Sequence, residues 1–517
     1  MTIKYFIFIF IFLMDFILYF LQNLHIFQLN YYNHETQLLW IKKNKIQIIN
    51  NAIFYVFSLV VMIFYKNWLF LTICFYIIMI IKHLPKKAKK PLVYTPRIKR
   101  TIMVSIILNI LIILGSYIIL GNYFIFIMPF ISMVTPFTII LCDNVLKPVH
   151  KHINKGFENK ARRKIEDMKD LIIIGITGSY GKTSTKNYLY QMLSTKYNTL
   201  KTPGNINTKM GIIKHINENL KATDEVYICE MGADHTGDIK ESCELVHPTY
   251  GIITTIGPQH LETFKTIDNI INTKFELADE IKVNNKGKIA LNFDNEYIRN
   301  KKYDGPFISY SLENKKADIY AYDIKVDENG MSFKVKDSNG KEITFETKIL
   351  GRHNIQNIVA ALSISQSLGI ELEKLKSVVR NLENVTHRLE LKKVGNKVII
   401  DDAYNSNPVG AKNALEVLSS FNGIKILVTP GMVELGEKEE ELNKEFGKNA
   451  TRVCDYIILV GKKQTLPIAS AIKKTKFDLK KLFVFDTIDE ALKKVDEIKP
   501  GNKQKIVLLE NDLPDQY

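Results

Sequence analysis

The chain has 517 residues, of which 46% are hydrophobic, and this length allows about three domains. Its formal net charge of +16 belongs to the first third, because residues 1–165 contain 20 Lys and Arg against 4 Asp and Glu, while the other 352 residues carry 50 of each sign. The basic balance is therefore no argument for nucleic-acid binding, and five scattered cysteines without CxxC or metal-ligand spacing point to a reduced, cytoplasmic setting.

The first 150 residues contain apolar runs long enough to cross a bilayer. A cleavable signal peptide is the alternative for the first run, but no small-residue cleavage site follows it and further apolar runs do. We therefore predict a transmembrane domain of about five helices over residues 1–150. The predicted spans are residues 3–22, 48–65, 67–81, 101–119 and 122–141.

The loops between these runs set the orientation. Residues 82–100 contain eight Lys and Arg and no acid, so the positive-inside rule places this loop in the cytoplasm. Five spans then put the N-terminus outside and everything after Leu141 inside. Residues 151–169 are predicted to be a basic juxtamembrane linker near anionic head groups. Asp15 lies inside the first span with no obvious partner, and is either functional or an isolated acid.

The stretch 170–194 reads as a strand, a phosphate-binding loop and a helix. Its glycines let the backbone approach an anion, Lys182 adds a positive charge, and the Thr183 hydroxyl can ligate Mg²⁺. A glycine-rich turn with a chance lysine is the plainer alternative. The predicted nucleotide-binding residues of the loop are Gly178, Ser179, Gly181, Lys182, Thr183 and Ser184.

Two later strands end in polar residues, at Glu230 and at His260. Ligands of open α/β sheets gather at the carboxyl ends of strands, so both side chains are expected near the phosphates. A carboxylate and an imidazole there suit a Mg²⁺ site, although either residue alone could be structural.

Further motifs join the phosphate loop, in which Ile176 occupies the place of the first Walker A glycine. They are GITGSYGKT (175–183), TPGNINTKMG (202–211), EMGADHTGDI (230–239), HLE (260–262) and TKFELAD (273–279). This series resembles the Mur ligase superfamily, and within it the MurF-type ligases. The resemblance implies an α/β architecture, with a central P-loop ATP-binding domain over residues 170–384.

The resemblance also implies roles for single residues. Lys274 would be carbamylated and would hold Mg²⁺ together with Thr183, Glu230 and His260. The residues that would contact the substrate in the second motif are Thr202, Asn205 and Asn207. The segment 351–369 is similar to a family helix whose His353 and Asn357 would lie near the adenine, and a helix cap at Asn354 is compatible with that role.

From about residue 385, strand-like runs alternate with helical stretches, which predicts a doubly wound, Rossmann-like domain over residues 385–517. HRLE (387–390) and DDAYNSNPVGA (401–411) are similar to the motifs with which Mur ligases close over ATP. By this resemblance Arg388 would reach the phosphates and Asp402 the ribose or the adjoining loop. Tyr404, Asn405 and Asn407 would shape the junction with the central domain.

The implied function is an ATP-dependent peptide ligase of cell-wall precursor synthesis, with ATP and Mg²⁺ as cofactors. Its catalytic residues would be Lys182, Glu230, His260 and Lys274, and its amine donor an amino acid or a dipeptide such as D-alanyl-D-alanine. A membrane domain stands where the family has a UDP-binding domain, so the acceptor is expected to be a precursor with a free carboxylate, lipid-linked in one form of the hypothesis, at the cytoplasmic membrane. Two alternatives remain: a membrane-bound ligase for another polymer, of poly-γ-glutamate or pseudomurein type, and a non-catalytic nucleotide-binding scaffold.

Overall fold

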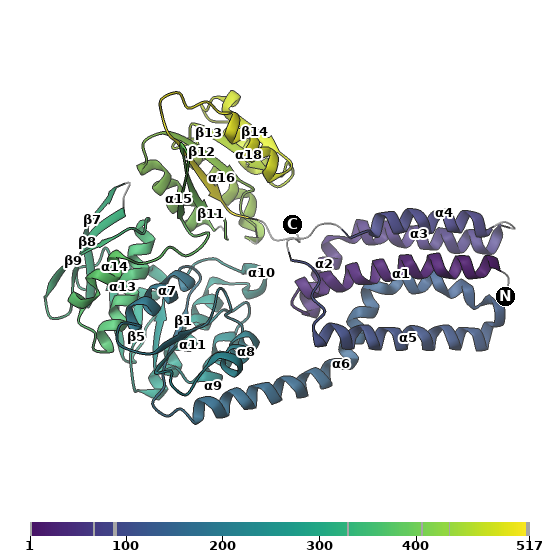
Figure 1. Cartoon of the computed structure of the whole chain (residues 1–517), viewed down its shortest axis with the longest axis horizontal. Coiled ribbons are helices and arrows are strands. Elements are labelled where there is room, and N and C mark those ends of the chain that lie inside the picture. Colours follow the sequence, from purple (N-terminus) through teal and green to yellow (C-terminus); the bar gives the residue numbers. More distant parts are fainter. Residues whose placement is uncertain are drawn as a thin grey trace. The chain divides into compact units, whose positions relative to one another are not determined.

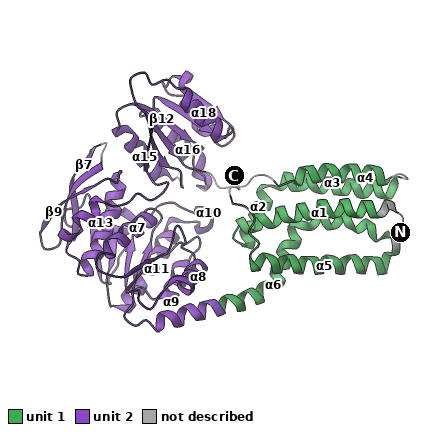
Figure 2. Ribbon diagram, in the orientation of Figure 1, with its two compact units in different colours: residues 1–155, 514–517 green, residues 156–513 purple. Residues whose placement is uncertain are grey.

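The computed structural model describes residues 3–65, 68–85, 90–327, 330–404, 407–433 and 435–512. The chain forms two compact units, whose boundary lies between Lys155 and Gly156 (Figure 2). The first contains helices and no strand in its described residues, and the second contains two separate sheets.

The first unit is a set of helices, most of them apolar over most of their length (Figure 1). They are α1 (Ile3–Leu29), α2 (His34–Lys43), α3 (Lys45–Phe64), α4 (Trp68–His83), α5 (Pro96–Leu120), the 3-10 helix η1 (Gly121–Phe126) and α6 (Ile127–Glu166). Among the described residues, four helical segments are long and apolar enough to cross a membrane, within α1, α3, α5 and the region of η1 and α6. The apolar helix α4, predicted as a further span, has 16 residues and is shorter than the ~20 that a span usually needs.

Asp15, which the sequence leaves without a partner, has two in the structure. Its side chain is fully buried, and its Oδ1 lies 2.8 Å from Nδ1 of His83 on α4. Its Oδ2 accepts a hydrogen bond of 2.9 Å from the Tyr55 hydroxyl on α3. This acid therefore links α1 to α3 and α4 in the interior of the bundle.

The predicted linker 151–169 is helical as far as Glu166, because α6 continues through it. Its later residues belong to the second unit, where the Lys164 ammonium donates to the backbone oxygen of Ile216 at 3.0 Å. Arg162 is held one turn from Glu158 by an ion pair of 2.9 Å.

The central domain is built on a nine-stranded sheet with the order β2-β3-β1-β4-β5-β6-β7-β8-β9. Its strands are β1 (Ile172–Thr177), β2 (Thr199–Lys201), β3 (Val226–Glu230), β4 (Tyr250–Ile253), β5 (Ile289–Asn292), β6 (Phe307–Ser311), β7 (Ile319–Asp327), β8 (Gly330–Lys336) and β9 (Glu342–Thr347). Strands β1 to β7 pair in parallel, and β8 and β9 extend the sheet as antiparallel hairpins.

Helices cover both faces of the sheet, since alternate residues of β1, β3 and β4 point into two different cores. One core packs Ile174 and Ile176 against α7 (Lys182–Leu193) and α13 (Arg352–Ser367). The other packs Ile173 and Tyr227 against α8 (Lys209–Asn219), α9 (Asp238–Val246) and α11 (Ile267–Asn284). Burial on both faces explains why these parallel strands read as continuous apolar runs. The shorter helices of this domain are α10 (Leu261–Phe264), α12 (Glu296–Arg299), η2 (Leu372–Leu375) and α14 (Lys376–Arg380).

The last domain has a six-stranded sheet with the order β10-β11-β15-β12-β13-β14. Its strands are β10 (Glu390–Val394), β11 (Lys397–Asp402), β12 (Ile424–Thr429), β13 (Tyr456–Val460), β14 (Leu482–Phe485) and β15 (Lys505–Glu510), and its helices are α15 (Pro408–Ser420), η3 (Gly436–Lys438), α16 (Glu439–Ala450), α17 (Leu466–Ile472), η4 (Leu479–Lys481) and α18 (Ile488–Glu497). All pairs are parallel except β10 with β11. The predicted doubly wound domain is confirmed, and β10 adds an antiparallel edge.

Candidate active site

The phosphate-binding loop joins β1 to α7, as predicted. Gly178 and Gly181 have φ values of +144° and +85°, which favour glycine. A Cβ atom on Gly178 would lie 2.1 Å from the Thr254 hydroxyl, and one on Gly181 would lie 2.5 Å from Oδ1 of Asn357. The Ser179 hydroxyl donates to the backbone oxygen of Gly257 at 3.0 Å. The loop is thereby fixed with its peptide groups at the start of α7.

Lys182 lies over this loop. Its ammonium donates to the backbone oxygens of Gly178 and Ser179, at 2.7 and 3.2 Å. Burial lowers the pKa of Lys182, and the nearby carboxylate of Glu230 opposes that shift. The lysine is thus held at the glycine turn.

Glu230 is the centre of the candidate site. In the sheet register it stands opposite Ile176, next to the end of β1, so its side chain arrives beside the loop. The carboxylate is almost fully buried; its Oε1 accepts from the Thr183 hydroxyl at 3.2 Å and from Nδ2 of Asn207 at 3.3 Å. The structure therefore brings these three predicted residues together.

Lys186 is a residue of the site that the sequence reasoning missed. Its ammonium donates to Oε2 of Glu230 at 2.8 Å and to the backbone oxygen of Gly204 at 2.7 Å. The side chain is fully buried, and it joins α7 to the loop that follows β2. Its position four residues after Lys182, on the same face of α7, is the signal that could have identified it.

The loop after β2 carries the three predicted substrate residues. Thr202 is fully buried, and its hydroxyl accepts from the backbone nitrogen of Glu230 at 3.1 Å. The Asn205 side chain is exposed. The backbone nitrogen of Gly232 donates to the backbone oxygen of Asn207 at 2.8 Å. Thr202 and Asn207 therefore position Glu230, while Asn205 faces outward.

Lys274 lies on α11 with only 3% of its surface exposed, and its ammonium is 5.9 Å from the centre of the Phe264 ring. Burial and the charge of Lys182 lower the pKa of Lys274 to about 7. A substantial fraction of this side chain is consequently a neutral amine near pH 7. This is unusual for a lysine and is common at catalytic sites.

His260 takes a left-handed conformation, with φ of +52°, just before α10. Its Nε2 lies 3.4 Å from Oδ1 of Asp234, which follows β3. Asp234 also contributes to the electrostatic environment of Lys182 and Lys274. His260 therefore contacts Asp234, a residue whose charge also acts on Lys182 and Lys274.

The donor set can be compared with the needs of Mg²⁺, which prefers hard oxygen ligands. Thr183 and Glu230 offer a hydroxyl and a carboxylate in contact with one another, and they fit such an ion. The nitrogen of Lys274 fits only once it carries an anionic oxygen group. His260, a nitrogen donor 3.4 Å from Asp234, suits the ion less well than Asp234 itself.

Helix α13 places Asn357 against the loop. Its Oδ1 accepts from the Thr185 hydroxyl at 3.2 Å, and its Nδ2 donates to Asn354 at 3.3 Å. Burial and Arg388 lower the pKa of His353 to about 4, so its imidazole is neutral at pH 7. The described contacts fix Asn357 at the glycine turn, and the predicted proximity of both residues to adenine stays a prediction.

The C-terminal domain contributes Arg388, whose Nη2 is 3.4 Å from the Thr183 hydroxyl. Its guanidinium carbon lies 4.5 Å from the centre of the Tyr404 ring. Burial raises the pKa of Asp402 to about 6, and Oδ1 of this residue accepts from the backbone nitrogen of Leu389 at 3.2 Å. Arg388 therefore faces the predicted phosphate site, and Asp402, at the end of β11, holds the backbone of its neighbour Leu389.

Asn407 caps α15, since its Oδ1 accepts from the backbone nitrogen of Gly410 at 2.9 Å. Asn405 lies outside the described residues. The contribution of both to the domain junction stays a prediction.

A cluster of titratable side chains at the start of the C-terminal domain is paired with a lysine. His387, Glu390 and Asp401 are close enough to hold a cation, but the Lys392 ammonium lies 2.6 Å from Asp401 and 3.1 Å from Glu390. This cation neutralises the carboxylates, so the group reads as an ion-pair cluster.

Comparison with known proteins matches both of these domains. Residues 176–365 match the family described as Mur ligase middle domain, and residues 387–509 match the Mur ligase, glutamate ligase domain. The UDP-N-acetylmuramoyl-tripeptide--D-alanyl-D-alanine ligase of Bacillus subtilis is 32% identical over 278 residues. That match covers 53% of this chain and 59% of the relative, so the chain spans well under two thirds of the relative's length.

Solved structures agree. MurF from Acinetobacter baumannii superposes with a TM-score of 0.63 at 27% identity, over 70% of this chain and 78% of that one. MurF from Thermotoga maritima in complex with ADP gives 0.61 at 26% identity, over 69% of this chain and 80% of that one. The shared fold is that of the central and C-terminal domains.

Proposed function

The chain carries the middle and C-terminal domains of the Mur ligase family, and we propose that it is an ATP-dependent ligase that forms an amide bond on a cell-wall precursor. The observation that carries this proposal is the buried Glu230 carboxylate, which meets Thr183 and Lys186 of α7 beside the phosphate loop. A phosphate loop whose threonine hydroxyl contacts a buried carboxylate has the arrangement that Mg²⁺-dependent phosphoryl transfer needs. The relatives named above join D-alanyl-D-alanine to a muramoyl tripeptide, and we propose a MurF-like donor for this chain as well.

In the proposed reaction, an acceptor carboxylate attacks the γ-phosphate of ATP and ADP leaves, which gives an acyl phosphate. The donor amine then attacks the acyl carbon, loses a proton, and releases inorganic phosphate as the amide forms. Lys182 and Arg388 would offset the charge of the transferred phosphoryl group, since both converge on the loop. Thr183 and Glu230 would hold Mg²⁺, which supplies charge neutralisation and orientation of the phosphates.

Lys274 is proposed to react with carbon dioxide. A neutral amine adds CO₂ and loses one proton, which yields an anionic carbamate with two oxygens. The lowered pKa of Lys274 supports this step, because only the neutral amine is nucleophilic. The product would give Lys274 the oxygen ligands that its nitrogen lacks.

The acceptor is proposed to be lipid-linked, because four helices long and apolar enough to span a membrane precede the catalytic domains in the described chain. A related ligase for another exported polymer would have the same architecture and remains the second candidate. A scaffold that only binds nucleotide is disfavoured by the joint burial of Glu230, Lys186 and Lys274, which binding alone does not require.

The test is phosphate release by the detergent-solubilised full chain with ATP, Mg²⁺ and D-alanyl-D-alanine. UDP-linked tripeptide and its lipid-linked counterpart serve as alternative acceptors, and Lys182→Ala is the control. We expect release that needs donor and acceptor, that favours the lipid-linked form, and that falls at least 100-fold in the variant. Release that ignores the donor would refute the ligase, and faster turnover of the UDP-linked form would refute the lipid-linked acceptor.

A further inference from the structure

The first unit has a charged cluster at the start of α5. Arg97, Lys99 and Arg100 lie in the first five residues of this helix, and Asp143 and His150 of α6 lie near Arg97 and Arg100. All five are on the side of the bundle that the basic loop 82–100 predicts to be cytoplasmic. This is the level at which the phosphate groups of lipids lie.

One positive charge of the cluster is already neutralised. Nη2 of Arg97 lies 2.9 Å from each carboxylate oxygen of the buried Asp143, and Nε2 of His34 lies 3.0 Å from Oδ2 of the same residue. The Arg97 guanidinium also lies 4.3 Å from the centre of the Tyr32 ring. These contacts fix the side chains of Arg97 and Asp143 at the base of the cluster.

Other donors of the cluster lack acceptors. Nε of Arg100 and both ring nitrogens of His150 are buried with no hydrogen-bond partner among the described residues. His150 is 5% exposed, and its Nδ1 is 3.5 Å from Oδ1 of Asp143, beyond a normal hydrogen bond. The Nε–H of Arg100 and the single N–H of a neutral imidazole at His150 are donors that call for an acceptor, and an oxyanion is an acceptor that matches both.

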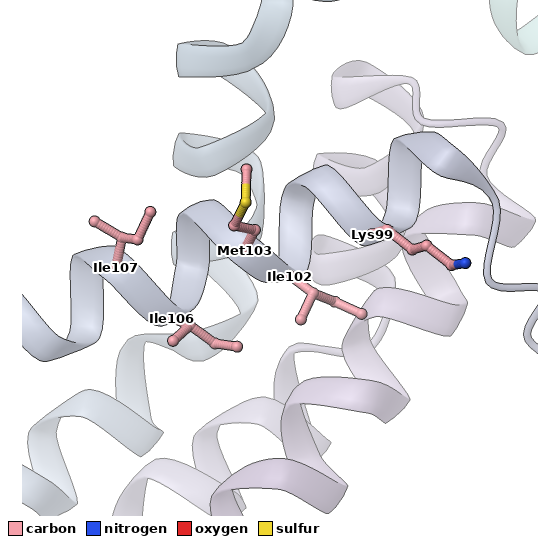
Figure 3. A pocket seen from close by; sticks show the side chains of 5 residues that line it. All are labelled: Lys99, Ile102, Met103, Ile106 and Ile107. Carbon is pink, nitrogen blue, oxygen red and sulfur yellow. The ribbon is translucent and has the colours of Figure 1, made fainter.

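An apolar groove begins at the same place. It is lined by Lys99, Ile102, Met103, Ile106 and Ile107, which project from successive turns of α5 (Figure 3). The lysine is at one end, and the four apolar side chains follow it at helical spacing along the helix (Figure 3). A cation at the end of an apolar groove is complementary to a molecule with an anionic head and a hydrocarbon chain.

We propose that this cluster binds the phosphate head group of an anionic lipid, with Lys99 and Arg100 on the phosphate and the groove of α5 on the first part of the chain. The inference deepens the proposed function, on which it rests for the identity of the lipid as the carrier of the acceptor. The binding site itself stands on the cluster and the groove. Lys99 supplies charge at the surface, while Arg100 and His150 supply donors below it.

The experiment measures binding to the full chain in an uncharged detergent by native mass spectrometry. Dodecyl phosphate is the test lipid, dodecylphosphocholine has the same chain with a zwitterionic head, and inorganic phosphate has no chain. The variant Lys99→Gln/Arg100→Gln removes two charges from the cluster. The matched control Lys42→Gln/Lys45→Gln removes two charges near the end of α2 and the start of α3.

We expect one dodecyl phosphate per chain, bound at least tenfold more tightly than dodecylphosphocholine and not displaced by an equal concentration of inorganic phosphate. The cluster variant should weaken binding at least tenfold and the control variant less than twofold. Lys99→Gln alone, at an exposed position, should weaken binding at least threefold, and it serves if the double variant does not fold.

Two results would overturn the proposal. Equal losses in the cluster and control variants would show diffuse attraction by the basic surface, and displacement by inorganic phosphate would assign the site to a free anion. Lys182→Ala should bind dodecyl phosphate like the unaltered chain, because it changes only the phosphate loop. Lipid binding and ligase activity can therefore fail separately.

Discussion

Lys274 makes the candidate site sensitive to pH. Its pKa is lowered from 10.5 to about 7, so its ammonium form dominates below about pH 7 and its neutral amine dominates above. Carbamate formation should therefore fall as the pH falls, with roughly tenfold less neutral amine at pH 6 than at pH 8. We expect a carbamate signal from ¹³C-bicarbonate in the NMR spectrum at pH 8 and a much weaker one at pH 6.

Lys274→Arg is the control for this experiment, because a guanidinium stays protonated at both values of pH. It should give no carbamate signal and little ligase activity. A signal of equal strength at pH 6 and pH 8 would show that the lowered pKa does not govern the reaction.

Lys186 is expected to matter for stability, because it pairs with Glu230 where neither side chain meets solvent. Lys186→Met leaves a buried carboxylate without its counter-ion, a change that costs about 3–5 kcal/mol in comparable pairs. The thermal unfolding midpoint of the full chain should fall clearly. Adding Glu230→Gln should recover most of the loss in stability, though not activity.

Lys444→Met is the matched change at an exposed pair with Glu440, and it should leave the midpoint nearly unchanged. If Lys186→Met were equally harmless, the pair could not be holding α7 to β3.

At the scale of elements, the turn between β1 and α7 depends on glycine. Gly181→Ala would place a Cβ atom 2.5 Å from Asn357 at a φ of +85°, so either the turn or α13 must shift. We expect ATP binding to weaken at least tenfold, measured by calorimetry. Gly156→Ala on α6, where the added atom meets open space, should bind ATP normally. Unchanged binding in both variants would contradict the geometry of the turn.

Three helices of the first unit are linked by Asp15. Asp15→Ala would leave His83 and Tyr55 without their acceptor, at about 1–3 kcal/mol for each buried group. The unfolding midpoint in detergent should fall, and it should fall less for Asp15→Asn, which keeps one acceptor. Ser116→Ala on α5 is the control. An equal fall for Ser116→Ala would indicate general sensitivity of the bundle.

Sequence patterns predicted the elements whose signals are local. The alternation of strands and helices in the last domain was predicted, because every strand there except the edge strand β10 is a short apolar stretch between turn residues. The continuation of α6 through the basic segment was not predicted, since a change in composition from apolar to charged does not end a helix. The partners of Asp15 were hidden because His83 is 68 residues away and Tyr55 is 40.

At the scale of the whole molecule, the sequence predicted those site residues that belong to motifs and that the order of the parallel strands brings together. Glu230 and Thr183 meet because β3 pairs with β1, which a parallel sheet ordered around the phosphate loop requires. Lys186 and Asp234 were missed, because their importance comes from burial and pairing that only the three-dimensional structure displays. The proposal of a lipid-linked acceptor rests on the first unit, which lies outside the residues that match the Mur ligase domains.

The most direct test of the central claim follows labelled D-alanyl-D-alanine into product. The full chain, with ATP and Mg²⁺, is given the lipid-linked and UDP-linked acceptors, and the acceptor is analysed by mass spectrometry. We predict an acceptor heavier by the dipeptide minus one water, formed with one ADP and one phosphate per amide bond, and absent with Lys182→Ala. ATP consumption with no dipeptide joined to either acceptor would contradict it.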